Sequence, residues 1–159
     1  MLPFVYVETT VVSYLTARPS RDVIIAGHQQ STHFWWDTER SRFELCCSQL
    51  VEQEASDGDS EFARARLAVL SLMTKLEITE TALSLAEELV RVGALPAKAR
   101  NDALHIAIAA VNQVPYLLTW NCRHMANAQI RVRIESVCAG RGFNSPILCT
   151  PEEMMEVER

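Results

Sequence analysis

The sequence lacks the long apolar runs and the targeting segments that mark membrane and exported proteins. No stretch approaches the roughly 20 apolar residues of a transmembrane helix. The N-terminal residues 1–6 have neither a basic lead nor the apolar core of a signal peptide. We therefore expect a cytoplasmic protein that does not associate with a membrane.

Paired and metal-binding cysteines are also missing. The five cysteines are odd in number, are scattered along the chain and show no C-x-x-C spacing. They fall mostly inside apolar segments, which indicates buried free thiols in a reducing compartment.

Several catalytic signatures are absent. The chain has no Gly-rich phosphate loop, no G-x-S-x-G motif and no Cys-His-acid signature, so nucleophilic catalysis has no support. The four histidines do not have zinc-site spacing, and we expect His105 to be a hydrogen-bonded core residue. If a metal is bound, oxygen ligands favour Mg²⁺ or Mn²⁺.

Basic residues are too few for a broad nucleic-acid-binding surface. The net charge is −5, whereas non-specific binding depends on Lys and Arg that neutralise phosphates. A local patch is still possible, and the alternative is that its members are solvated surface charges. The candidates are Lys98, Arg100, Arg123, His124, Arg131 and Arg133.

The chain does contain regularly alternating strand and helix patterns. Its 159 residues predict one domain, residues 1–159. The alternation predicts a three-layer α/β/α sandwich with a central, mostly parallel sheet. We expect strands at 4–7, 43–47, 76–78, 116–119 and 146–149, and helices at 9–15, 21–40, 49–54 with Ser48 as its N-cap, 61–73, 80–92, 100–114, 122–138 and after Pro151.

Three acidic residues lie where apolar runs give way to turns or helices. Glu8 follows the first strand, Glu54 follows the second, and Asp102 opens an apolar helix. The carboxyl ends of parallel strands share one edge of the sheet, so these residues can meet there. The alternatives are a helix cap or an Arg partner for Glu8, and a favourable interaction with the helix N-terminus for Asp102.

Two further choices complete the candidate site. Glu52 and Glu54 lie about 200 degrees apart on their helix, and Glu54 shares the face of Leu50 and Val51, so we choose Glu54. Asn121 follows the fourth strand, where its amide oxygen serves either a hard cation or a turn.

These segments resemble the PIN-domain family, in particular the VapC-like ribonucleases of bacterial toxin-antitoxin pairs. Tyr6 to Leu15 looks like the first motif of the family, with an acid followed by Thr. Ser48 to Glu54 looks like the second motif, Asp102 to Ala109 like the third, and Leu118 to Asn121 lies where the fourth is expected. The resemblance spans nearly the whole chain.

The resemblance implies metal-dependent hydrolysis of RNA phosphodiesters. Glu8, Glu54 and Asp102 would hold Mg²⁺ or Mn²⁺, and Asn121 would position a water or the scissile phosphate. Thr9 and Thr119 would orient the carboxylates as hydroxyl donors. The sequence departs from the family pattern in two ways: the first acid is Glu where many members have Asp, and the fourth position is an amide.

The implied partners are RNA, an antitoxin protein and a second copy of the chain. Phe34, Trp35 and Trp36 lie together on one predicted helix, either as core residues or as a dimer or antitoxin contact. Two other functions stay open. One is a non-catalytic PIN-fold binding protein. The other is a flavodoxin-like receiver, which the absence of an acid pair beside the first strand disfavours.

Overall fold

Five parallel strands form the sheet of the computed structural model, which describes residues 1–157. They are β1 (Phe4–Val7), β2 (Glu44–Ser48), β3 (Thr74–Leu76), β4 (Tyr116–Leu118) and β5 (Ile147–Cys149). Their order is β3-β2-β1-β4-β5, and every pairing is parallel. The apolar first strand is therefore central, and all carboxyl ends lie at one edge of the sheet.

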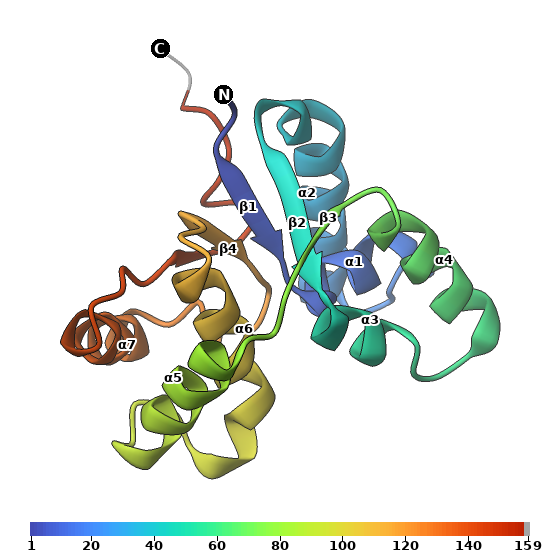
Figure 1. Ribbon diagram of the computed structural model, residues 1–159. Coiled ribbons are helices and arrows are strands. Elements are labelled where there is room, and N and C mark those ends of the chain that lie inside the picture. The colour runs from blue at the N-terminus through green and yellow to red at the C-terminus, as the bar shows by residue number, and fades with distance from the viewer. Residues whose placement is uncertain (158–159) are drawn as a thin grey trace.

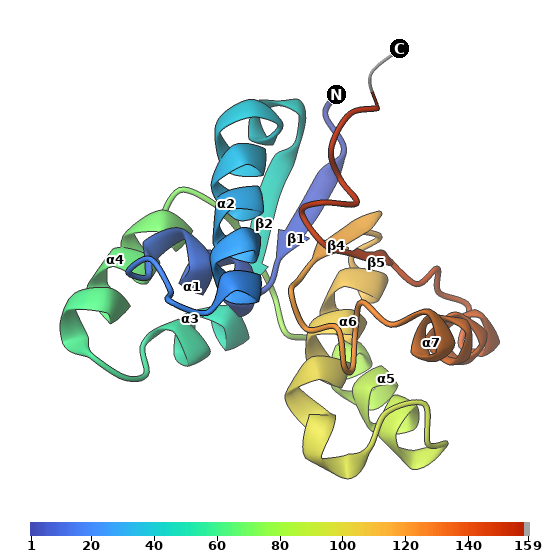
Figure 2. The ribbon, with the colours of Figure 1, turned by 180° about the vertical axis from the view of Figure 1, so that it is seen from behind.

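Within residues 1–157, seven α-helices surround the sheet in two groups, seen from opposite sides in Figures 1 and 2. Helix α1 contacts α2, α3 and α4, and α5 contacts both α6 and α7. Their bounds are α1 (Thr9–Thr16), α2 (Val23–Thr38), α3 (Gln49–Ala55), α4 (Ser60–Leu70), α5 (Glu80–Arg91), α6 (Arg100–Val111) and α7 (Ala128–Gly140), with 3₁₀ turns at Arg40–Arg42 and Ala97–Ala99. The α/β architecture agrees with the sequence prediction.

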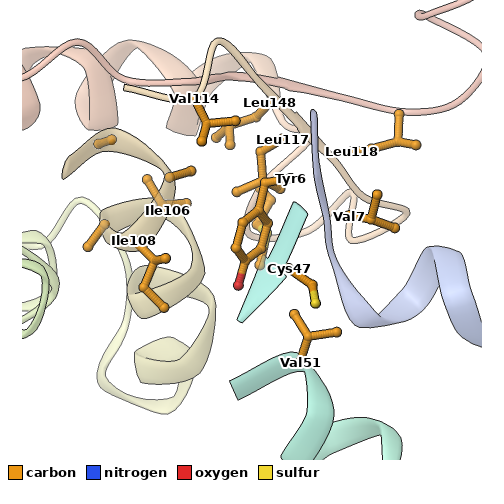
Figure 3. Close-up of a cluster of buried hydrophobic side chains, with 14 of the residues drawn as sticks. Tyr6, Val7, Cys47, Val51, Ile106, Ile108, Val114, Leu117, Leu118 and Leu148 are labelled. Atoms are coloured by element: carbon orange, nitrogen blue, oxygen red, sulfur yellow. The ribbon is translucent and has the colours of Figure 1, made fainter. Parts of the chain in front are cut away.

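The central strand connects the two faces of the core. Successive strand residues point to opposite faces, and Figure 3 shows Tyr6 on the side of Ile106 and Ile108 from α6, with Val7 on the other side. Tyr6 and Val7 are fully buried. Helix α6 is buried, because apolar residues occupy nearly all of its sides. Burial of α6 fixes the position of Asp102 at its start.

Some predicted boundaries were wrong. Strand β3 lies at Thr74–Leu76 rather than at 76–78, because it pairs alongside β2, which ends at Ser48. Helix α7 begins at Ala128 rather than at 122, since Asn127 caps it by accepting from two backbone N–H groups. The helix predicted after Pro151 is only a series of turns through residue 155, and its predicted end lies partly outside the described residues.

The cysteine prediction holds for four residues and fails for one. Cys46, Cys47, Cys138 and Cys149 are buried free thiols, whereas Cys122 is exposed. Cys122 lies in the turn that replaces the predicted start of a helix, so no neighbouring element covers it. Within residues 1–157, no helix is both long enough and apolar enough to cross a membrane.

The aromatic cluster of α2 divides between core and surface. Trp35 is fully buried and stacks on Phe43 with ring centroids 6.1 Å apart. Trp36 is partly buried, and the Arg40 guanidinium carbon lies 4.4 Å from the centroid of its ring. Phe34 is exposed. Core packing therefore accounts for Trp35, and Phe34 is available for contact with another molecule.

Candidate active site

Glu8 ends β1 and caps α1. Its Oε2 accepts from the Thr10 backbone N–H at 2.8 Å, and its Oε1 accepts from the hydroxyls of Thr10 at 2.7 Å and Thr119 at 2.8 Å. The residue is only 4% exposed. Burial raises the pKa of Glu8, partly offset by the nearby His105 ring and by these donors. The helix-cap role weighed as an alternative for Glu8 is therefore present.

Asn121 lies just beyond β4 and forms a turn. Its backbone N–H donates to the Thr119 hydroxyl at 2.9 Å. Its Oδ1 accepts from the backbone N–H groups of Arg123 at 3.2 Å and His124 at 3.0 Å. Both acceptor sites of the amide oxygen are thus used locally. Asn121 therefore acts as a turn residue, one of its two expected roles. Its role as a metal ligand stays a prediction.

Glu54 points from α3 toward the sheet. Its Oε1 accepts from the Thr9 hydroxyl at 2.6 Å and is 2.7 Å from the His105 Nε2. Although burial opposes ionisation, the hydrogen bonds from His105 and Thr9 outweigh it and lower the pKa of Glu54. Glu52 instead pairs with Lys75 at 2.8 Å. The inward choice of Glu54 over Glu52 therefore agrees with the structure.

Asp102 lies in the first turn of α6, where the positive end of the helix favours a carboxylate. Its Oδ2 is 3.2 Å from the Nδ1 of His124, a residue of the loop after β4. The Asp102 side chain is 22% exposed and that of Glu54 is 30% exposed. Both side chains are therefore partly open to solvent, whereas Glu8 is enclosed.

Hydrogen bonds link three of the four predicted positions, and the fourth, Glu54, bonds to a sequence neighbour of Glu8. From Glu8 the contacts pass through Thr119 to Asn121, and from Asn121 through His124 to Asp102. A second branch reaches Glu54 through Thr9, which directly follows Glu8 in sequence. The four residues come from four different parts of the chain. The contacts make one polar network at the carboxyl edge of the sheet.

The donor set suits a hard divalent cation. In residues 1–157 none of the three carboxylates pairs with Lys or Arg, and a buried carboxylate such as Glu8 is costly without a compensating charge. Carboxylate oxygens are the ligands that Mg²⁺ and Mn²⁺ prefer. In the same range, no three acidic, His or Cys side chains already stand close enough to hold one ion. Binding therefore needs the carboxylates to come closer together, and the partly exposed Asp102 side chain would turn toward Glu8 and Glu54.

Sequence reasoning missed several members of the network. Thr10 makes two bonds to Glu8, and its own hydroxyl accepts from the Trp120 backbone N–H at 2.9 Å. His105 was expected in the core, which its 1% exposure confirms, but it also contacts Glu54. The spacing of His105, three residues after Asp102 on one helix face, was the available signal. Nothing in the sequence indicated the contact of His124.

The parallel sheet and its flanking helices define a PIN-like α/β fold. The chain is similar to a solved structure described as VapBC2 from Rickettsia felis bound to a DNA fragment from their promoter, with a TM-score of 0.55 and 16% sequence identity. The match covers 76% of this chain and 89% of that chain. At this identity the similarity establishes the fold. No protein-family model and no curated protein matches the sequence.

Proposed function

We propose that this protein is a divalent-metal-dependent endoribonuclease that hydrolyses RNA phosphodiesters, acting as the toxin of a type II toxin-antitoxin pair. One observation carries the proposal. Carboxylates from β1, α3 and α6 join one polar network at the carboxyl edge of a PIN-like sheet, with no Lys or Arg partner in residues 1–157. A bound cation would supply the positive charge that stabilises these carboxylates in their ionised form.

In this proposal each residue has a defined task. Glu8, Glu54 and Asp102 hold Mg²⁺ or Mn²⁺, and hydroxyl donors to Glu8 and Glu54 fix their orientation. The cation, when bound, supplies the Lewis acidity that activates an attacking water and stabilises the charge developing on the phosphate. Asn121 offers its amide nitrogen to a phosphate oxygen, because the turn occupies its amide oxygen.

RNA would meet this acidic protein through a local basic patch. Lys98 and Arg100 are exposed at the start of α6, and Arg123 is exposed beside Asn121. None of these three cations forms an ion pair within residues 1–157, whereas Arg131 pairs with Glu153 at 3.1 Å. Free cations on two sides of the site suit a phosphate backbone that passes over it.

The partner proposals follow from the same comparison and from the surface. The similar structure is described as VapBC2, so we propose an antitoxin partner for this chain. We also propose a homodimer, since Val23, Ile24 and Phe34 of α2 are exposed apolar side chains. The free buried thiols fit a protein that works in the reducing cytoplasm.

A cleavage assay tests the enzyme proposal. Purified protein is mixed with a diverse RNA pool in Mn²⁺, and products are followed with and without a chelator. Cleavage should require the metal and should fall roughly 100-fold or more in Asp102→Asn. Glu52→Gln, a matched acid change on the surface, should leave the rate unchanged. Absence of metal-dependent cleavage of any RNA in the pool would refute the proposal.

A second candidate is a non-catalytic PIN-fold binding protein. It is favoured by the engaged amide oxygen of Asn121, by the fully hydrogen-bonded Glu8 and by the absence in residues 1–157 of a ready-made three-residue metal group. This candidate predicts no Mn²⁺ binding and a partner protein that remains bound through purification. The enzyme proposal predicts Mn²⁺ binding that depends on Asp102.

A further inference from the structure

A buried chain of hydrogen bonds leads from the sheet interior to Glu54. The Ser48 Oγ lies 2.7 Å from the Tyr6 hydroxyl, and the same hydroxyl lies 2.7 Å from the His105 Nδ1. The other ring nitrogen, Nε2, lies 2.7 Å from the Glu54 Oε1. Ser48 and Tyr6 are fully buried, and His105 is 1% exposed. Solvent therefore reaches this chain only at its Glu54 end.

The carboxylate of Glu54, at the end of these contacts, decides which atoms donate each hydrogen bond. An ionised carboxylate only accepts hydrogen bonds, so the His105 Nε2 must carry a proton and donate it to Glu54. With a neutral ring, Nδ1 then accepts from the Tyr6 hydroxyl, and the Tyr6 oxygen accepts from Ser48. Each polar side-chain atom of Ser48, Tyr6 and His105 thus has a partner, and the ring also packs edge-on against Tyr6 with centroids 5.7 Å apart.

The chain ties Glu54 to the elements that carry the other two acids. His105 belongs to α6 and lies one turn after Asp102, while Tyr6 belongs to β1 and lies two residues before Glu8. The second donor to the same Glu54 oxygen is Thr9, directly after Glu8. Glu54 is thus held between β1 and α6. Its position relative to Glu8 and Asp102 is set by these contacts.

We infer that Tyr6 and His105 are positioning residues for Glu54, an inference that rests on the proposed metal site. Tyr6 holds the His105 ring, and the ring holds one oxygen of Glu54, so that the carboxylate is aimed before any cation arrives. Removing a residue that orients a metal ligand typically weakens metal binding about 10- to 100-fold.

Calorimetric titration with Mn²⁺ tests this role in the full-length protein. Tyr6→Phe removes one hydroxyl but keeps the ring, and should weaken Mn²⁺ binding about tenfold or more. Ser48→Ala is the matched control, because it breaks the other hydrogen bond of the same hydroxyl and Ser48 makes no helix-cap bond. Thr32→Val is a second control that removes a buried bond to Trp120 at 2.7 Å. Both controls should bind Mn²⁺ within about twofold of the wild type.

The contradicting result is a Tyr6→Phe protein that binds Mn²⁺ as tightly as the wild type, or a Ser48→Ala protein that loses as much affinity as Tyr6→Phe. A second measurement does not depend on metal. Nitrogen-15 spectra of the wild-type histidines should show a proton on the His105 Nε2 that exchanges slowly with solvent, and an unprotonated Nε2 would overturn the inference. If the wild type binds no Mn²⁺, the proposed function fails, and these spectra alone decide the hydrogen-bond chain.

Discussion

The Thr119 hydroxyl donates to the Glu8 Oε1 at 2.8 Å and thereby joins the ends of β4 and β1 across 111 residues of sequence. Thr119 is fully buried, and its oxygen also accepts from the Asn121 backbone N–H. The Thr119 hydroxyl therefore holds both the Glu8 carboxylate at the end of β1 and the Asn121 turn after β4. Hydroxyl groups of this kind organise the candidate site.

Thr119→Val should destabilise the fold. The substitution keeps the side-chain shape but leaves Glu8 with one donor fewer and the Asn121 N–H without its acceptor, which costs roughly 1–3 kcal/mol for buried groups. Urea denaturation measures the change in the free energy of unfolding. Thr38→Val is the control, since Thr38 is exposed and bonds only to a carbonyl in its own helix. Equal effects of the two substitutions would contradict the role given to Thr119.

Glu8 should make stability depend on pH. Burial raises the pKa of Glu8 above its ordinary value of 4.5 in the folded protein. The folded state therefore binds a proton that the unfolded chain has already lost. The stability contributed by the protonated form is complete below the unfolded pKa and is lost as pH rises through the folded pKa. Glu8→Gln, which cannot ionise, should gain stability relative to the wild type over this range.

Urea denaturation of both proteins, without divalent cations, at intervals from about pH 4 to about pH 8 gives the comparison. Mn²⁺ should then stabilise the wild type more than Glu8→Gln, because only the wild type offers the full carboxylate. A stability difference that stays constant with pH would show that Glu8 titrates alike in both states, contrary to its burial.

Glu54 and Glu52 should behave differently although they are two residues apart. Glu54→Gln removes the carboxylate that Thr9 and His105 orient, so Mn²⁺ affinity and RNA cleavage should both fall. Glu52→Gln loses a surface pair with Lys75 and should change neither. Calorimetry and the cleavage assay are run on the two variants side by side. A larger loss of Mn²⁺ affinity and cleavage in Glu52→Gln than in Glu54→Gln would show that Glu54 was wrongly assigned to the site.

Thiol reactivity should distinguish Cys122 from the other cysteines. Cys122 is exposed, whereas burial raises the pKa of Cys46 and of Cys149 to about 12, which suppresses the reactive thiolate. A chromogenic disulfide reagent should therefore modify one thiol in the native protein and all five after denaturation. In Cys122→Ser, fast labelling of the native protein should disappear. Rapid reaction of two or more native thiols would contradict the described core.

The sequence predicted well wherever a local pattern decides the structure. The apolar run at 4–7 predicted strand β1, and the helical spacing around Glu54 indicated its inward face. The hydroxyl roles expected for Thr9 and Thr119 match their observed hydrogen bonds to Glu54 and Glu8. In each case the relevant information lies within a few neighbouring residues, or at a strand end that a parallel sheet brings to a common edge.

The rest depends on contacts between distant segments. The bond between Tyr6 and His105 spans 99 residues, and no pattern in either segment indicates it. The loop around His124 was predicted as a helix because its composition permits one, whereas the Asn121 side chain closes a turn there. The assignment of residues 1–159 to a single domain, and of the four site residues to metal binding, remain predictions.

Anomalous diffraction from crystals grown with Mn²⁺ tests the central claim most directly. The account predicts a manganese peak at the carboxyl edge of the sheet, in contact with carboxylate oxygens of Glu8, Glu54 and Asp102, and its loss in Asp102→Asn. A well-ordered structure at saturating Mn²⁺ with no peak at this edge, or with the three carboxylates still apart, would contradict it.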